Sequence, residues 1–353
     1  MTQYHDLDPF NHGTTTVEYE EMPKSEASRL ATILKEGWGR CDVNILRLSA
    51  GAEKNSNHFR VETKTGVYLF KHSHINNPET QDVVNRAVAY LNDNGVKTPT
   101  IIPTTEGATF YVTGNEVFCF YDFIEGEHFD GSQAELQNVA GEIARLHGAL
   151  ATIPYEREIR GLNGSVVGHN REALERIIKA VREHGEQTEF DSYALGILDE
   201  IDERSRAIVD VKVDGLPSQI VHYDLHPHNV LFSPESKEVA SILDFDSLRY
   251  SQRARDVGFG MHRFARTCGA KTERRNDVGM DVRDRAKLFL NSYVAENELT
   301  DEEMRVLPLA IQDEAMRRVI TGLGNHYLRS DTTWSFDLPK QVTTLHEGGF
   351  FSF

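Results

Sequence analysis

Residues 221–232 read Val-His-Tyr-Asp-Leu-His-Pro-His-Asn-Val-Leu-Phe, and residues 241–246 read Ser-Ile-Leu-Asp-Phe-Asp. Asn229 follows Asp224 within the first stretch, and Asp244 follows a short apolar run in the second. Carboxylate and amide oxygens are hard ligands of the kind that Mg²⁺ prefers beside phosphate oxygens and water. We therefore expect a loop site in which Asp224 faces a hydroxyl group while Asn229 and Asp244 hold a magnesium ion.

This arrangement is what phosphoryl transfer from a metal-bound nucleotide requires, because the protein mainly has to position a few groups. Asp224 would orient the attacking hydroxyl and accept its proton late in the reaction. Asp246 would point the same way as Asp244 in an extended segment and reach a second metal ion or bond the backbone locally. We expect His226 to face the γ-phosphate, and His222 to be structural, with its ring bonded to backbone near Asp244.

The same stretch supports an alternative, a zinc-dependent hydrolase. His222, Asp224, His226 and His228 alternate along the chain, and all are good zinc ligands. Pro227 interrupts the extended backbone that would point them one way, and no second ligand cluster stands out in the sequence. The hydrolase therefore remains the second choice.

Size and composition indicate a globular protein of two domains or two lobes. The chain has 353 residues, 39% hydrophobic and 26% charged. No apolar run approaches the roughly 20 residues of a membrane span, and the polar N-terminus does not read as a signal peptide. The scattered Cys41, Cys119 and Cys268 are typical of reduced thiols, so we expect a cytoplasmic protein without a membrane partner.

The formal net charge of −17 argues against a nucleic-acid partner, since phosphate backbones are bound by Lys and Arg. One basic stretch departs from this average. It contains Arg249, Arg253, Arg255, Arg263, Arg266, Lys271, Arg274 and Arg275. We interpret it as a solvated helix face followed by a loop, and the alternative is an edge of a cleft that faces an anion.

Hydrophobic periodicity divides the chain into two parts. The first carries a short helix over 25–35 capped by Ser25, a helix over 78–94 stopped by Gly95, and an irregular lead-in over 1–24. Its expected strands are 43–48, 57–63, 67–71, 109–113 and 117–123. The second carries helices over 133–150, 171–183, 191–209, 284–296 and 301–329, and strands over 220–223, 230–232 and 241–243. We predict an α+β fold with a lobe over 1–123, a lobe over 124–353 and a hinge at 123–126.

The first lobe offers two nucleotide-binding features. The loop at 48–57 is rich in small and polar residues, which suits backbone N–H groups that cover phosphates. Its candidate contacts are Ser49, Gly51, Asn55 and Ser56. Lys71 closes the third strand and could reach the α- and β-phosphates as a point charge.

These residues resemble the aminoglycoside phosphotransferase and choline kinase superfamily, which includes homoserine-kinase-like members and has a fold similar to protein kinases. The order and spacing agree over about residues 44–265. The matching segments are Leu48 to Ala52, Tyr68 to Lys71, Tyr121 to Gly126, Ile143 to His147, His222 to Asn229, Leu243 to Asp246 and Arg255 to Gly258.

The resemblance implies that Asp224 is the catalytic carboxylate, that Asn229 and Asp244 bind magnesium, and that Lys71 is the nucleotide lysine. It further implies that backbone near Tyr121 and Phe123 receives the adenine and that Asp256 steadies the catalytic segment. One position departs from the family pattern. A small-lobe helix usually supplies a Glu that pairs with the Lys, but here Val84 and Asn85 stand near that position, with Glu79 and Asp82 about a turn earlier. The partner of Lys71 therefore stays open.

We therefore expect an ATP- and Mg²⁺-dependent kinase that phosphorylates a hydroxyl of an amino alcohol, amino sugar, sugar or aminoglycoside. A nucleotide-binding protein without transfer activity is a further alternative, and the oligomeric state stays open. Residues 160–210 and 259–329 should select the acceptor. Candidate contacts are Asp313, Glu314, Asn325 and His326, while Tyr293, Tyr327 and Trp334 could line a pocket or belong to the core.

Overall fold

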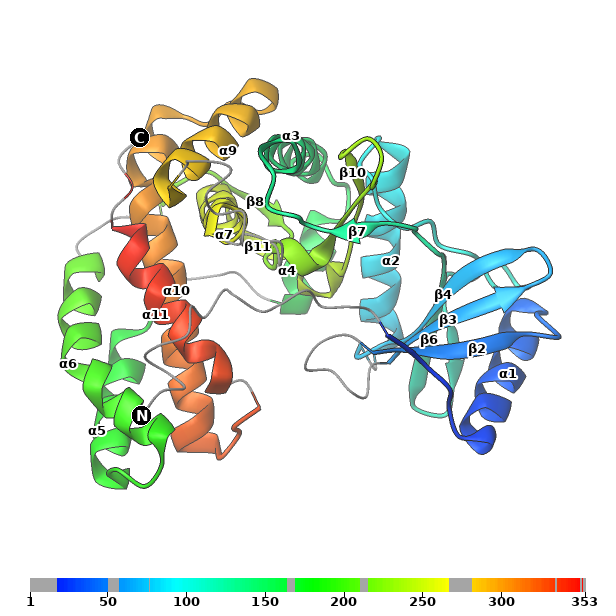
Figure 1. Cartoon of the computed structure of the whole chain (residues 1–353), viewed down its shortest axis with the longest axis horizontal. Helices are drawn as coiled ribbons and strands as arrows, with labels where there is room; N and C mark the ends of the chain where they lie inside the picture. The colour runs from blue at the N-terminus through cyan, green and yellow to red at the C-terminus, as the bar shows by residue number, and fades with distance from the viewer. Residues whose placement is uncertain are drawn as a thin grey trace.

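A computed structural model of the chain describes residues 18–49, 57–75, 77–163, 169–209, 215–266, 281–333, 335–349 and 351. The chain forms a small lobe built on an antiparallel sheet and a larger, mostly helical lobe (Figure 1). The expected α+β class and two-lobed arrangement are confirmed. The predicted boundary between Phe123 and Ile124 lies just after the last strand of the small sheet.

The small lobe is a six-stranded antiparallel sheet in the order β1-β2-β3-β4-β6-β5. Its strands are β1 (Glu18–Glu20), β2 (Asn44–Ser49), β3 (His58–Thr63), β4 (Gly66–His72), β5 (Tyr111–Thr113) and β6 (Glu116–Asp122). Helix α1 (Lys24–Trp38) packs its apolar side on one face of this sheet, and Trp38 contacts the rings of Phe70 and Phe120. Because side chains alternate across a strand, Lys71 points to the opposite face from Phe70.

Two details of the lead-in differ from expectation. Residues 18–20 form β1, which pairs antiparallel with β2, although this segment was expected to be irregular. Helix α1 begins at Lys24 after Pro23, and Ser25 lies inside the helix and does not cap it. Proline can start a helix without a side-chain cap because its φ angle is already fixed.

Helix α2 (Pro78–Asp93) stands between the small sheet and the helical lobe (Figure 1). The Asn77 side chain caps it by accepting from the backbone N–H groups of Glu79 and Thr80. The apolar side of α2, including Val84 and Leu91, belongs to the same core as the helices of the large lobe. This helix therefore joins the two lobes through packing.

The large lobe is built from helices and two small sheets. Its helices are α3 (Gln133–Leu150), α4 (Glu156–Asn163), α5 (Arg171–His184), α6 (Glu189–Val209), α7 (Arg253–Arg266), α9 (Val282–Glu296), α10 (Asp301–Arg329) and α11 (Leu338–Gly348). One sheet has the order β10-β9-β7 and the other pairs β11 with β8. Their strands are β7 (Glu127–His128), β8 (Ser218–Val221), β9 (Val230–Phe232), β10 (Val239–Ile242) and β11 (Arg249–Gln252).

Helix α7 contradicts the interpretation of the basic stretch as a solvated helix face. Arg255 is 1% exposed and Arg263 is 6% exposed, because α7 packs against α9 and α10. Arg255 forms an ion pair with Asp313, and Arg253 forms one with Glu303 at 2.6 Å, so charge inside the lobe is compensated. Lys271, Arg274 and Arg275 lie outside the described residues.

Two smaller expectations concern membranes and thiols. Within the described ranges, every helix is too short or too polar to cross a bilayer. Cys41 is exposed and Cys119 is buried, and both are free thiols, whereas Cys268 lies outside the described residues.

Gly258 marks the tightest contact between α7 and α10. A Cβ atom at this position would lie 2.6 Å from Cγ1 of Ile311, which is itself buried in the core. Gly258→Ala is expected to lower the free energy of unfolding by about 1–3 kcal/mol, because overpacking forces neighbouring groups to shift. Urea unfolding checks this value.

Gly322→Ala is the matched control, since it also lies in a long helix but a Cβ there meets nothing within 4 Å. It is expected to leave stability unchanged or to raise it by up to about 1 kcal/mol through helix propensity. Equal effects of the two substitutions would contradict the packing at Gly258.

Candidate active site

Lys71 joins the two lobes at the predicted site. Its Nζ lies 2.8 Å from Oδ2 of Asp246 and 3.3 Å from Oδ1 of Asp244. Burial of Lys71 would lower its pKa, but the charges of Asp246 and Asp244 outweigh this and raise the pKa above its ordinary value. The lysine of β4 is therefore a charged group held directly against the predicted metal ligands.

The backbone turns sharply between the two aspartates. Asp244 follows β10 with φ 60°, in the left-handed region that is unfavourable for a residue with a Cβ atom, and Phe245–Ser247 forms a 3₁₀ turn, η3. The expectation of an extended segment around Asp246 was wrong. The turn nevertheless brings both carboxylates to Lys71. The two side chains face the same way because of this turn and not because of the alternation of side chains along a strand.

Asn229 links the two loops of the site. Its Nδ2 donates to the backbone carbonyl of Asp224 at 2.9 Å and lies 3.4 Å from the Asp224 carboxylate. The backbone N–H of Leu243, the residue before Asp244, donates to the Asn229 carbonyl at 2.9 Å. Since the amide nitrogen is used, the side-chain oxygen of Asn229 is the atom left for a cation.

Asp224 lies at the open side of this arrangement, with 31% of its side chain exposed. Nε2 of His226 lies 3.4 Å from Oδ2 of Asp224, and Nη1 of Arg318 lies 3.8 Å from Oδ1. Burial alone would raise the pKa of Asp224, but His226 and then Arg318 hold it well below its usual range. The carboxylate is therefore ionised at neutral pH and accessible to a substrate.

The two histidines have different environments. The His222 ring is fully buried, and its Nε2 bonds the backbone carbonyl of Leu243 at 2.9 Å, as expected for a structural residue. Nδ1 of His226 accepts from the backbone N–H of His228. Among the described residues, no three His, Cys, Asp or Glu side chains are grouped closely enough to hold one metal ion.

Asp256 holds the backbone of the segment that precedes Asp224. It is 2% exposed, and its oxygens accept from the backbone N–H groups of His222 at 3.1 Å and Tyr223 at 3.0 Å. Tyr223 has φ 70°, a conformation that a bulky side chain disfavours, so these bonds fix a strained residue. His147 completes the contact at 3.0 Å.

Asp256→Asn is expected to lower the free energy of unfolding by about 1–3 kcal/mol, because the amide cannot accept all of these bonds and one buried donor is left unsatisfied. Chemical denaturation followed by circular dichroism measures the change. An unfolding midpoint equal to that of the wild type would show that the Asp256 contacts do not constrain the segment.

The small-lobe helix offers Lys71 no acid among the described residues. Asn85 occupies the buried side of α2, where it donates to the Thr109 carbonyl at 3.0 Å and accepts from Gln81 at 2.8 Å. The Tyr121 hydroxyl also donates to Asn85, at 3.4 Å. A neutral polar network therefore takes the place of the family's glutamate, and the Lys71 partners come from the large lobe.

The remaining nucleotide-site predictions are only partly covered by the structure. Gly51, Asn55 and Ser56 lie outside the described residues, and Ser49 is described only as the end of β2. Tyr121 lies in β6 with its hydroxyl turned toward α2, and the ring of Phe123 lies 5.1 Å from the guanidinium of Arg60. The assignment of adenine to this segment stays a prediction.

The sequence matches a family model described as "Phosphotransferase enzyme family" over residues 45–288, more than half of the chain. The chain belongs to this family.

Solved structures show the same fold at low identity. A spectinomycin phosphotransferase in complex with ADP and spectinomycin aligns with a TM-score of 0.64 and 15% identity, over 91% of this chain and 93% of that chain. An aminoglycoside phosphotransferase from Alicyclobacillus acidocaldarius gives 0.63 and 18%, over 94% of each chain. The microcompartment-associated aminopropanol kinase gives 0.57 and 13%, over 92% of this chain and 98% of that one.

The expected kinase-like fold and superfamily are thereby confirmed, and the protein is a phosphotransferase by family. At identities this low, the likeness to each solved structure supports only a shared fold. The acceptor that it uses must be inferred from its own residues.

The predicted acceptor contacts of this phosphotransferase divide into core and site residues. Asp313 is 3% exposed and contacts His169 and Arg255, and Tyr293 is fully buried against His147, so both are structural.

The His326 ring bonds the Ser335 hydroxyl, and the Tyr327 hydroxyl bonds Asp191. Trp334 lies outside the described residues. Asn325 accepts from Arg329 at 3.1 Å on the same helix. Of the predicted contacts that the structure describes, Glu314 lies beside the segment that carries Asp224, where it accepts from the Tyr223 hydroxyl at 2.9 Å.

Sequence reasoning missed three arginines of the site: Arg317 and Arg318 on α10, and the role of Arg249 on β11. They surround the Tyr223 ring, although α10 lies about ninety residues further along the chain than Tyr223. The local signals were the spacing of Arg317 and Arg318, which follow Glu314 by three and four residues on one helix face, and the basic stretch that contains Arg249.

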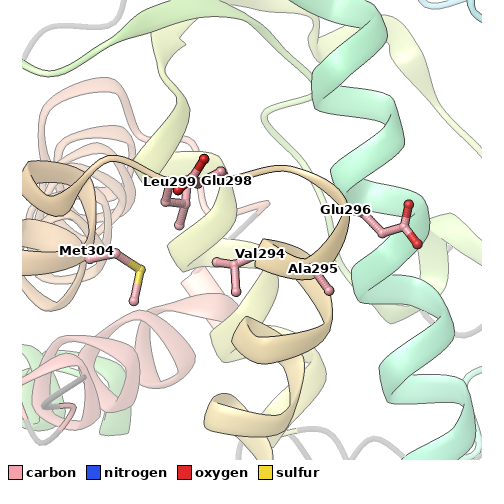
Figure 2. A pocket seen from close by; sticks show the side chains of 6 residues that line it. All are labelled: Val294, Ala295, Glu296, Glu298, Leu299 and Met304. Carbon is pink, nitrogen blue, oxygen red and sulfur yellow. The ribbon is translucent and has the colours of Figure 1, made fainter.

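A hollow of about 520 Å³ at the turn between α9 and α10 contains none of these residues (Figure 2). Val294 and Met304 point into it, whereas Glu296 points toward α3, where it pairs with Arg145 at 3.8 Å. The candidate active site therefore rests on the convergence of charged groups from both lobes and not on this hollow.

Proposed function

We propose that this phosphotransferase moves the γ-phosphate of ATP to a hydroxyl group of a small metabolite. One observation carries the proposal: Lys71 from the small lobe meets Asp244 and Asp246 in the same place where Asn229 bonds Asp224. A cation, a carboxylate base and hard oxygen ligands are the parts that phosphoryl transfer needs.

The residues present fit a magnesium ion. Asp244, with 49% of its side chain exposed, and the side-chain oxygen of Asn229 offer oxygen donors from adjacent loops, and Asp246 adds a third. Magnesium bound there would neutralise negative charge on the phosphates of ATP. The roles of Asn229, Asp244 and Asp246 as its ligands are part of this proposal.

The protein's own groups then account for the transfer. Asp224 orients the acceptor hydroxyl, whose oxygen forms a bond to the γ-phosphorus while the bond from that phosphorus to the bridging oxygen of ADP breaks. The hydroxyl proton passes to Asp224 and from there to water. Lys71 offers its positive charge to the α- and β-phosphates, and His226 is placed beside Asp224, where the γ-phosphate would arrive.

ATP consumption in the presence of magnesium tests the proposal across amino alcohols, sugars, amino sugars, hydroxy acids and aminoglycosides. Acceptor-dependent release of ADP, with phosphorylated acceptor as the second product, is the expected result. Tight ATP binding without any phosphorylated product across the panel would instead favour the alternative of a nucleotide-binding protein without transfer activity.

A further inference from the structure

Tyr223, the residue before the predicted catalytic carboxylate, is surrounded by guanidinium groups. The Arg249 guanidinium lies 4.1 Å from the centre of the Tyr223 ring, and those of Arg317 and Arg318 each lie 5.7 Å from it. Arg317 also donates to the Tyr223 hydroxyl. Three cations from β11 and α10 therefore gather around one aromatic side chain.

One of these cations lies beside Asp224, and two of them are partly exposed. Arg318 is 3.8 Å from the Asp224 carboxylate, and the side chains of Arg317 and Arg318 are 24% and 26% exposed. Since the acceptor hydroxyl must approach Asp224, the rest of the acceptor has to lie close to these arginines.

Direct ion pairs engage only part of the positive charge in this place. Glu314 is buried and pairs with both neighbours on α10, with Arg317 at 2.8 Å and with Arg318 at 2.9 Å. Asp224 lies 3.8 Å from Arg318, while Asp256 acts on Arg249 and Asp337 acts on Arg318 from further away. Among the described residues, the direct pairs with Glu314 and Asp224 therefore engage Arg317 and Arg318 and leave Arg249 without one.

Arg249 is the cation left over. Its Nε donates to the backbone carbonyl of Ser247 at 3.2 Å, and in the described part of the chain no carboxylate forms an ion pair with it. Burial lowers the pKa of Arg249, and the charge of Arg318 lowers it further while Glu314 opposes the change. Burial and Arg318 likewise lower the pKa of Arg317 to about 10. An anion bound here would relieve this crowding.

A purely structural role accounts for only part of the cluster. Arg318 donates to the Tyr223 backbone carbonyl at 3.1 Å and stacks over Phe259 at 4.0 Å, so it fastens α10 to the catalytic segment. In the described part of the chain, Arg249 donates to the Ser247 carbonyl and stacks on the Tyr223 ring, and it makes no hydrogen bond to the backbone of the segment that carries Asp224.

We infer that the acceptor carries an anionic group, a carboxylate or a phosphate, which binds to Arg249 and Arg317 while a neighbouring hydroxyl faces Asp224. Guanidinium forks match the geometry of both kinds of anion. The inference rests on the proposed kinase function and narrows its acceptor class. It disfavours cationic amino sugars and amino alcohols, because a positive charge would be placed against arginines.

Two matched acceptor series test this class. Glycerate, glycerol and aminopropanediol differ in charge on a three-carbon skeleton, and glucose phosphate, glucose and glucosamine differ in charge on a sugar. For each compound, kcat/KM is measured at saturating magnesium–ATP and constant ionic strength. The shift in melting temperature of the protein saturated with magnesium–ADP is measured in parallel, so binding is seen even where turnover is absent.

The anionic member of at least one series is expected to exceed its neutral partner by about tenfold in kcat/KM or to give the larger thermal shift. A response to glycerate alone assigns a carboxylate acceptor, and a response to glucose phosphate alone assigns a phosphorylated one. Preference for a cationic member, or no response to either anion in both measurements, would overturn the inference.

Arg249→Gln should remove the preference for the anion while leaving the affinity for magnesium–ADP unchanged. Arg305→Gln is the matched control, because Arg305 lies on α10 but is 68% exposed and pairs only with Glu302 among the described residues. If Arg249→Gln weakens ADP binding and spares the anion preference, the arginine serves the nucleotide and the inference is wrong. Failure of the kinase proposal looks different, since no acceptor would then be phosphorylated, whether magnesium–ATP binds or not.

Discussion

Asp224→Ala is expected to lower kcat by about 10²–10⁴-fold, the range that a positioned acid–base group contributes. The affinity for ATP should remain largely unchanged, because Lys71 and the residues proposed to hold magnesium are intact. The reason is geometric: the Asp224 side chain is 31% exposed, and Asn229 donates to the Asp224 backbone carbonyl at 2.9 Å. Initial rates and nucleotide titration separate the two effects.

Asp199→Ala controls for the loss of a surface carboxylate, since the Asp199 side chain is 94% exposed and pairs with Arg182. It should retain wild-type turnover. An Asp224→Ala variant with more than about a tenth of wild-type kcat would show that another group accepts the proton or that none is needed.

Lys71→Met is expected to lower kcat/KM for ATP by about 10–100-fold, which corresponds to the loss of one or two charge-assisted hydrogen bonds to phosphate. The same change removes the cation that holds Asp244 and Asp246 at 3.3 Å and 2.8 Å. Two carboxylates would then face each other across the site without a counter-charge. Steady-state kinetics with ATP varied, together with calorimetric ATP binding, measures the effect.

Lys97→Met is a suitable control, because Lys97 is 41% exposed and its ion pair with Glu238 lies at 3.5 Å. Unchanged ATP kinetics are expected for it. Wild-type kinetics in Lys71→Met would mean that the contact between the lobes does not reflect a nucleotide site.

The regular elements could be predicted well where apolar periodicity is strong. Helix α3 begins at Gln133 and ends at Leu150 as its amphipathic pattern predicts, because its buried side packs continuously in the core. The three-residue strand β1 was missed, since its only regular partner is β2, far along the chain, and no local pattern marks such a pairing. Ser25 was mistaken for a cap because Pro23 starts α1 by backbone geometry.

The site could be predicted where its chemistry is local in sequence. Asp224, Asn229, Asp244 and Asp246 come from one short span, and the structure brings Asp244 and Asp246 to Lys71 and Asn229 to Asp224. The partners of that lysine could not be predicted, because they depend on how the lobes pack and on the turn at Asp244.

The burial of the basic stretch could not be predicted from the sequence. Its charges were assigned to a solvated helix face, whereas Arg255 and Arg263 are buried. The sequence alone does not show which acidic side chains will pair with a buried arginine, as Asp313 does with Arg255. The grouping of Arg249 with two arginines of α10 around Tyr223 is likewise a product of tertiary structure.

The magnesium dependence of ATP affinity, measured by calorimetry on the wild type, Asn229→Ala and Asp244→Asn, tests the shared metal site most directly. Magnesium should tighten ATP binding to the wild type by about tenfold or more, and each substitution should abolish most of this gain. The same tightening in all three proteins would contradict a site in which Asn229 and Asp244 hold one cation against the phosphates.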